Sequence, residues 1–163
     1  MSRCSSVTER LTTVPGLGVA TLRAALGAML ISALLAGCVS APTSRDATLY
    51  ERLGGEAGIA AITEGMLARS AEDPRIRDDF AEADIVNLYE RLVEHVCALA
   101  GGPCTYGGRD MKAAHVGLGL TEADFNALVE NLVDAMTERG VSIAAQNELL
   151  AVLAPMRDDV IRQ

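Results

Sequence analysis

The chain has 163 residues and carries 22 acidic against 14 basic side chains, giving a formal charge of −8 at pH 7. This balance argues against non-specific nucleic-acid binding, which requires a basic surface that displaces counterions. Half of the residues are hydrophobic, which excludes a chain that is disordered by composition. The two histidines, His95 and His115, are too few for a histidine-rich metal site built from this chain alone.

The first 37 residues are predicted to be a signal peptide and not part of the fold. Arginines precede an apolar run over 24–36, and the Leu-Ala-Gly-Cys sequence at 35–38 resembles a bacterial lipobox. At such a site the chain is cut before the cysteine, and the thiol receives a diacylglycerol. A signal that is cleaved without lipidation and an uncleaved anchor are the alternatives. The apolar run is shorter than the ~20 residues that span a bilayer, which favours lipidation of Cys38.

The lipobox resemblance implies an exported lipoprotein on the periplasmic side of a bacterial envelope. Val39 and Ser40 directly follow Cys38 and offer no aspartate retention signal, which by resemblance to the enterobacterial sorting rule favours the outer membrane over the inner one. Segment 38–46 is small and polar with one proline, a composition typical of a flexible tether. The folded part is predicted over 47–163, as one small domain with one core.

Two cysteines, Cys97 and Cys104, remain in the predicted domain. In an oxidising periplasm they can form a disulfide, which would stabilise the folded state by ~2 kcal/mol. The alternative is two unpaired thiols, one of them buried on a helix.

The domain is predicted to be all-α, because apolar residues recur with helical periodicity and no stretch keeps the alternation of a strand. Glycine pairs and prolines mark the ends of the expected helices, and Asp84, Thr121 and Ser142 are expected N-terminal caps. Pro155 is expected to bend the last helix. In chain order, the expected elements are helices over 47–53 and 56–71, an irregular corner over 75–83, a helix over 85–100, a loop over 104–110, and helices over 111–115, 122–139 and 142–161.

His115 is the most informative residue of the domain. It lies in an apolar segment before a glycine-rich stretch, and such a histidine alone is more often a satisfied core residue than a ligand. The chain has no glycine-rich phosphate loop after a strand, no Gly-x-Ser-x-Gly, no Cys-x-x-Cys and no His-Glu-x-x-His motif. The surroundings of His115 therefore have to decide its role.

These surroundings resemble the proximal-histidine region of the group I truncated haemoglobins. The pattern is Met-Lys-x-x-His-x-Gly-x-Gly-Leu-Thr-x-x-x-Phe over 111–125, and the resemblance extends to Leu-Tyr-x-x-Leu-Gly-Gly at 49–55, Ala-Gly-Gly-Pro at 100–103 and Tyr-x-Gly at 106–108. It implies a two-over-two globin sandwich that holds one haem b per chain. Neutral imidazole is a good ligand of haem iron, so the resemblance also implies that His115 is the axial ligand.

The resemblance further implies which residues line the haem. Phe80 matches the corner phenylalanine that packs flat on the haem in nearly all globins, with an ordinary core aromatic as the alternative. Lys112, and less surely Arg109, are expected to pair with a propionate or else to be solvated. Counting between the motifs gives the haem-lining residues Met66, Leu67, Phe80, Leu88, Leu92, Val96, Met111 and Lys112.

The expected distal pocket departs from the family pattern. Group I members typically place a tyrosine where counting puts Leu67, and often a polar residue where it puts Leu88 or Leu92. A missing donor in a dry pocket costs ~1–3 kcal/mol of O2 binding, whereas CO and NO carry less charge and suffer less. The NO dioxygenase reaction is therefore in doubt for this chain. His95 and Met66 are alternative sixth ligands of the iron.

The leading expectation is a haem protein that binds a diatomic gas (O2, CO or NO), exported and anchored to the membrane by lipid on Cys38. One alternative is a haem enzyme with redox, peroxidase-like or NO-detoxifying activity, for which a distal acid or base is needed and only His95 is available. The other is a haem-free helical lipoprotein that serves protein interaction. No nucleic-acid partner is expected, and the sequence does not identify a reductase.

Overall fold

The computed structural model describes residues 47–163. The predicted signal peptide, the tether and Cys38 lie outside the described residues, so these assignments stay predictions. Every regular element between 47 and 163 is helical, which confirms the all-α class. None of the helices in this part of the chain has the length and the apolar composition that a bilayer span requires.

The helices occur where the periodicity predicts them, with one exception at the end of the chain. Pro155 does not bend a continuous last helix: α6 ends at Leu153, a 3-10 turn contains the proline, and α7 begins at Arg157. Proline lacks the N–H that the helical ladder needs, and its ring crowds the preceding turn. The elements are α1 (Leu49–Arg52), α2 (Gly55–Glu72), η1 (Arg77–Phe80), α3 (Ile85–Leu99), α4 (Met111–His115), α5 (Glu122–Glu138), α6 (Ile143–Leu153), η2 (Ala154–Met156) and α7 (Arg157–Val160).

The three predicted caps are present. The Asp84 carboxylate accepts the Asn87 N–H at 3.1 Å, and the Ser142 hydroxyl accepts the Ala145 N–H at 3.3 Å. At α5 the capping box is reciprocal, because the carboxylate three residues after Thr121 accepts the Thr121 N–H at 2.8 Å. Each cap pairs an amide that the helix itself leaves without a partner, which fixes where the helix begins.

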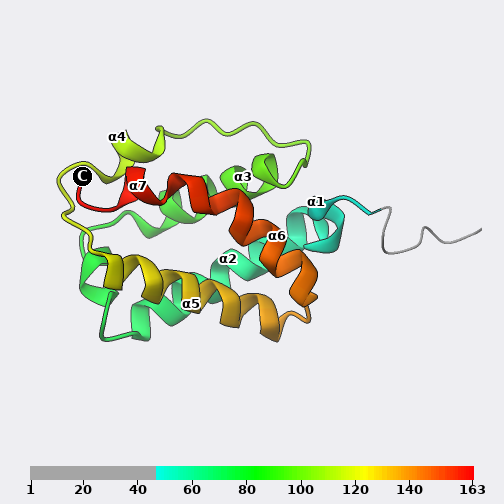
Figure 1. Ribbon diagram of the computed structural model, residues 1–163, viewed down its shortest axis with the longest axis horizontal. Helices are drawn as coiled ribbons and strands as arrows, with labels where there is room; N and C mark the ends of the chain where they lie inside the picture. Colours follow the sequence, from blue (N-terminus) through cyan, green and yellow to red (C-terminus); the bar gives the residue numbers. More distant parts are fainter. Residues whose placement is uncertain (1–46) are drawn as a thin grey trace, which may run out of the picture. The chain divides into compact units, whose positions relative to one another are not determined.

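Helices α2 and α5 lie side by side and form the most extensive helix contact of the domain (Figure 1). They approach closely because small residues face each other: a Cβ added at Gly65 would lie 3.4 Å from the Cβ of Ala135. Phe125, Leu128 and Val129 of α5 are half-buried. The buried residues of α5 are Ala127, Asn131, Leu132, Ala135 and Met136.

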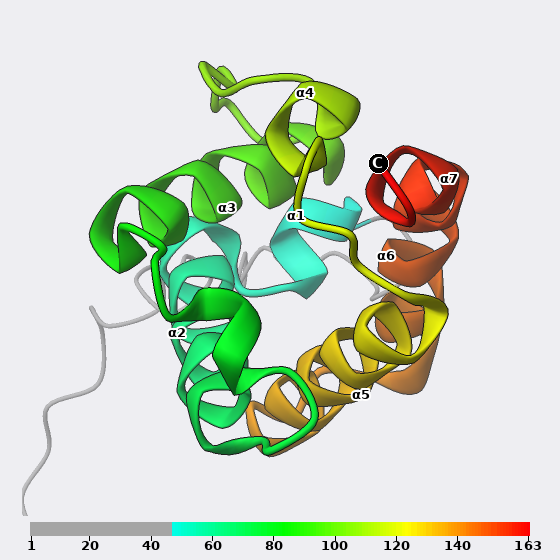
Figure 2. The ribbon, with the colours of Figure 1, turned by 90° about the vertical axis from the view of Figure 1, so that its left-hand side faces the viewer.

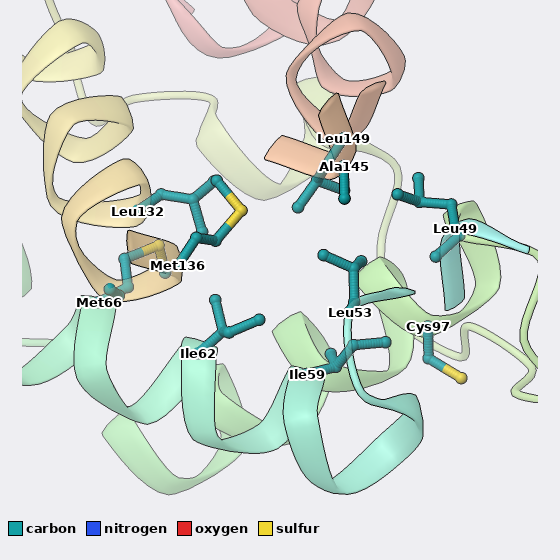
Figure 3. Close-up of a cluster of buried hydrophobic side chains, with 12 residues drawn as sticks. Leu49, Leu53, Ile59, Ile62, Met66, Cys97, Leu132, Met136, Ala145 and Leu149 are labelled. Carbon is teal, nitrogen blue, oxygen red and sulfur yellow. The ribbon is translucent and has the colours of Figure 1, made fainter. Parts of the chain in front are cut away.

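The core lies between α1, α2, α5 and α6. Figure 3 shows side chains from these four helices pointing toward one another, with Ile59 and Ile62 of α2 facing Leu149 of α6. Ile59, Met136 and Leu149 are at most 1 % exposed. Burial of this kind supplies most of the favourable free energy of folding, so these four helices form the stable part of the domain.

Helices α3 and α4 lie at the margin of this core. α3 packs against α2, and α4 packs against α7 near the C-terminus of the chain (Figure 2). Between them the segment 101–110 runs back along the molecule from the end of α3 to α4 (Figure 1). The candidate ligand His115 is thus carried on a short helix outside the main core.

Candidate functional site

His115 is the last residue of α4 and is half-buried. The helix is fixed at its start, where the Asp110 carboxylate accepts the Ala113 N–H at 2.8 Å. The Nδ1 atom of His115 lies 2.6 Å from the carbonyl oxygen of Met111, one turn earlier. A carbonyl only accepts hydrogen bonds, so Nδ1 carries a proton, and in the neutral imidazole Nε2 is then the nitrogen with the lone pair. This is the arrangement of a metal-binding imidazole whose second nitrogen fixes its tautomer and orientation.

Within residues 47–163, no group of three or more histidine, cysteine or carboxylate side chains is placed to hold a metal ion. A bare ion would need several protein ligands, whereas iron that is already held by a porphyrin needs only one or two. A single imidazole with a free Nε2 therefore fits a haem better than it fits an isolated cation.

Helix α3 carries the apolar surface that such a group needs. Its sequence is strongly amphipathic, yet Cys97 is its only buried residue. The predicted lining residues Leu88, Leu92 and Val96 are all half-buried. Leaving apolar surface in contact with water costs free energy, so a flat apolar group that covers this face would stabilise the fold.

A cavity of about 450 Å³ lies where α2, η1 and the first turns of α3 meet. It brings together two of the predicted distal residues, Leu67 and Phe80. The remaining wall is mostly apolar, with one carboxylate and one phenol. The lining residues are Glu64, Leu67, Ala68, Ala71, Phe80, Ile85, Val86 and Tyr89.

Counting residues between the sequence motifs does not predict several of the residues that line this cavity. Ala68 and Ala71 follow Leu67 on the same side of α2, so their helical spacing was a usable signal. Ile85 and Val86 are 46 % and 70 % exposed and border the cavity from the start of α3. Their role depends on how α3 crosses α2, which no local pattern encodes.

Met66 and Leu67 are neighbours in sequence and have different surroundings. Met66 is 6 % exposed and belongs to the buried core, where Figure 3 shows it beside Leu132 and Met136. Leu67 is half-buried and lines the cavity. Of the two, Leu67 therefore has the environment expected for a residue of a ligand pocket.

His95 contacts the segment that follows α3. Its ring centroid lies 4.6 Å from that of Tyr106, with the two planes tilted by 35°. The Tyr106 hydroxyl donates to the Arg109 carbonyl at 2.7 Å. Burial lowers the pKa of His95 below its ordinary value, which favours the neutral imidazole. In the described structure His95 thus helps to hold the 101–110 segment against α3.

A disulfide joins Cys97, at the end of α3, to Cys104 in the same segment. The Glu94 carboxylate adds to this link, because it accepts the Gly107 N–H at 3.3 Å and binds Arg91 at 2.7 Å. Together these contacts tie α3 to the segment that leads to α4.

The two expected propionate partners have different surroundings. Lys112 is exposed on α4, beside Met111, which is half-buried. The Arg109 guanidinium donates to the Ala113 carbonyl at 3.2 Å and so already supports α4. Lys112 therefore fits the propionate role better than Arg109 does.

Comparison with known proteins identifies the family. The family model for bacterial-like globins matches residues 48–162. A group 1 truncated haemoglobin of Tetrahymena pyriformis is 31 % identical over 118 residues, which cover 72 % of this chain and 98 % of that protein. One from Mycolicibacterium paratuberculosis is also 31 % identical, over 72 % of this chain and 86 % of the relative.

Solved structures agree with this assignment. The Fe(III) form of the Tetrahymena pyriformis truncated haemoglobin has a TM-score of 0.69 at 32 % identity and matches over 72 % of this chain and all of that one. The 2/2 haemoglobin of a Synechococcus species, solved in the cyanomet state with covalently attached haem, has a TM-score of 0.66 at 30 % identity, with the same coverage. The chain therefore belongs to the bacterial-like globin family, as a truncated haemoglobin that binds haem.

Proposed function

We propose that the chain binds one haem b, which Nε2 of His115 would hold, and that the bound haem takes up a diatomic gas, O2, CO or NO. Haem supplies the iron that such gases bind. The hydrogen bond between His115 Nδ1 and the Met111 carbonyl carries the proposal, because it occupies Nδ1, orients the ring and leaves Nε2 as the nitrogen that can bind iron.

The apolar residues around the site support haem binding. Leu67, Leu92 and Val96 pack against the core but remain half-buried, so each keeps surface that a porphyrin can cover. Phe80 is half-buried at the end of η1, where a flat aromatic ring can stack on a macrocycle. Covering these side chains would add their burial to the stability of the haem-bound protein.

The apolar character of the distal residues supports a preference among the gases. Leu67 occupies the position where relatives of group I typically place a tyrosine, and leucine donates no hydrogen bond. Bound O2 takes up partial negative charge, so it loses more from a missing donor than CO or NO does. We infer faster O2 release than in relatives that carry a tyrosine there.

We also propose that the protein is exported and anchored by lipid on Cys38. The Leu-Ala-Gly-Cys sequence at 35–38 supports the anchor. The disulfide between Cys97 and Cys104 supports export independently, because such bonds persist in oxidising compartments and are rare in the cytosol.

Optical spectra of the full chain with haem, in the ferric, ferrous and CO-bound states, test the haem site. The wild type is expected to show a Soret band and a five-coordinate ferrous form, and His115→Ala to lose most of its haem. His95→Ala is the matched control, since it removes the other histidine, and is expected to keep the haem. No haem uptake by the wild type would contradict the proposal and favour an interaction protein. A six-coordinate ferrous form that His95→Ala or Met66→Leu abolishes would favour redox chemistry over gas binding.

A further inference from the structure

We infer that residues 161–163, here called the C-terminal hook, position the axial imidazole of His115 by holding the segment 116–120 that follows it. This inference rests on the proposed role of His115 as the haem ligand. It makes Arg162 a positioning residue, because Arg162 acts on the iron ligand through the backbone of the neighbouring segment.

Two backbone hydrogen bonds join the hook to this segment. The Arg162 N–H donates to the Leu120 carbonyl at 2.9 Å, and the Gly117 N–H donates to the Gln163 carbonyl at 3.1 Å. The hook is itself anchored, because the buried Ile161 is only 7 % exposed. The Gln163 side chain adds donated bonds to the Asp158 and Ile161 carbonyls at 2.7 and 3.0 Å.

Ion pairs reinforce the same junction. Glu122, in the first turn of α5, lies 3.1 Å from the Arg157 guanidinium and 3.5 Å from that of Arg162. The Arg157 guanidinium also lies 6.0 Å from the centre of the Phe125 ring. The end of the chain thus contacts both sides of the connection between α4 and α5.

The other backbone hydrogen bonds of segment 116–120 join it to α4, where the Val116 N–H donates to the Lys112 carbonyl at 3.0 Å and the Leu118 N–H donates to the His115 carbonyl at 3.1 Å. Gly117 and Gly119 adopt positive φ angles of 84° and 64°, with no atom within 4 Å of a Cβ placed at either position. Val116 and Leu118 are 65 % and 57 % exposed, so their side chains are not packed into the core. The bonds to the hook are therefore the backbone hydrogen bonds that join this segment to a part of the chain other than α4.

The backbone of Arg162 has a strained conformation, and this conformation accompanies the hydrogen bonds of the hook. Arg162 has φ 59° and is the only residue other than glycine with a positive φ between 47 and 163. Such a conformation persists only where the surroundings over-determine it, and it marks candidate functional positions. Here it accompanies the N–H bond to the Leu120 carbonyl, which connects the end of the chain to the segment after the ligand.

The consequence for the site follows from the place of His115. It is the last residue of α4, so its ring is restrained by the Met111 carbonyl, and its own backbone carbonyl accepts the Leu118 N–H of segment 116–120 at 3.1 Å. Partners that orient an axial ligand also tune the metal that it binds. Loosening the hook is therefore expected to alter the iron–imidazole bond before it alters the fold.

Three substitutions at Arg162 test the inference in the full chain with haem. All three remove the ion pair with Glu122. They differ in whether the backbone at position 162 can keep a positive φ and the N–H that binds the Leu120 carbonyl. Glycine adopts positive φ freely and keeps the N–H, valine keeps the N–H but disfavours positive φ, and proline removes the N–H and fixes φ near −65°. The readouts are the iron–histidine stretching band of the ferrous protein in resonance Raman spectra and the rate of haem loss.

We expect Arg162→Gly to stay nearest the wild type, since the exposed pair with Glu122 contributes little, Arg162→Val to broaden or shift the band, and Arg162→Pro to shift it most and speed haem loss about tenfold, as for the loss of one hydrogen bond. Far-ultraviolet circular dichroism reports whether each variant is folded. If Arg162→Pro does not fold, the comparison of Arg162→Val with Arg162→Gly decides the question. Identical bands and haem-loss rates in the folded variants would overturn the inference. Failure of wild type to bind haem, or retention of haem by His115→Ala, would instead contradict the proposed function.

Discussion

The part of the domain around α2 and α5 and the part around α3 and α4 are held together differently. In the first, side chains such as Ile59 and Met136 are buried to 1 % exposure or less, and small residues let the helices meet closely. In the second, α3 has one buried residue, and α4 is held by a cap, a disulfide-linked segment and the hook. The first part is a complete core, whereas the second is the part that the proposed haem would complete. Stability and ligand binding thus depend on different residues.

The largest expected difference between the two regions is in the stability lost when one apolar side chain is truncated in each. Met136→Ala is expected to lower the free energy of unfolding by ~2–5 kcal/mol with or without haem, because it opens a cavity in a complete core. Leu92→Ala is expected to cost about 1 kcal/mol or less without haem, and more when haem is bound. Denaturant unfolding of both forms measures this. Equal costs in the haem-free proteins would mean that the face of α3 already belongs to the core.

A donor placed in the cavity tests the apolar distal side. Leu67 lines the cavity with Phe80, so Leu67→Tyr is expected to slow O2 dissociation by roughly tenfold to a hundredfold, through ~1–3 kcal/mol of added hydrogen bonding. CO dissociation is expected to change much less. Leu67→Phe is the matched control, because it adds the ring without the hydroxyl. Stopped-flow measurement of both gases would contradict the proposal if tyrosine and phenylalanine behaved alike.

Opening the disulfide removes a covalent link of the second region. Cys97 and Cys104 link the end of α3 to the segment before α4, and reduction is expected to lower the free energy of unfolding by ~2 kcal/mol. Cys104→Ala is the better substitution, since Cys97 is 0 % exposed and its loss would also leave a cavity. The variant should unfold identically with and without a reductant. If the reductant still lowers the stability of Cys104→Ala, the loss of stability in the wild type does not come from this disulfide.

Most of the fold could be predicted from the sequence, because it depends on local signals. The structure confirms the caps at Asp84, Thr121 and Ser142 and the helices that periodicity predicts at α2 and α3. Each of these signals lies within one continuous stretch of the sequence. The outcome at Pro155 could not be predicted, since a proline bends or interrupts a helix according to what packs around it.

The site was less predictable, because its parts come together through tertiary contacts. His115 and Phe80 stand in recognisable patterns, but the tautomer of His115 depends on the Met111 carbonyl, and the different surroundings of Met66 and Leu67 depend on how α2 faces α5. The strain at Arg162 has no sequence signal at all, since arginine does not favour positive φ. Residues of this last kind are found only by inspecting the backbone.

The smallest expected effect is a dependence of stability on pH, which arises at the polar end of the α2–α5 contact. Hydrogen bonds from the Arg75 side chain and N–H, at 2.7 and 3.0 Å, and from Asn131 at 3.3 Å lower the pKa of Asp73 to about 2, from an ordinary value of 3.8. A carboxyl with a lowered pKa in the folded state stabilises it fully above the pKa of the unfolded chain.

This stabilisation is therefore expected to be complete above about pH 4 and to disappear as the pH falls toward 2. Asp73→Asn keeps the shape and one acceptor, and should be less stable than the wild type at neutral pH and nearly as stable at pH 2. Thermal unfolding of the haem-free proteins across this range measures the difference. A gap between the two proteins that stays constant with pH would show that Asp73 acts through packing alone, and the polar contact would then add nothing that depends on its charge.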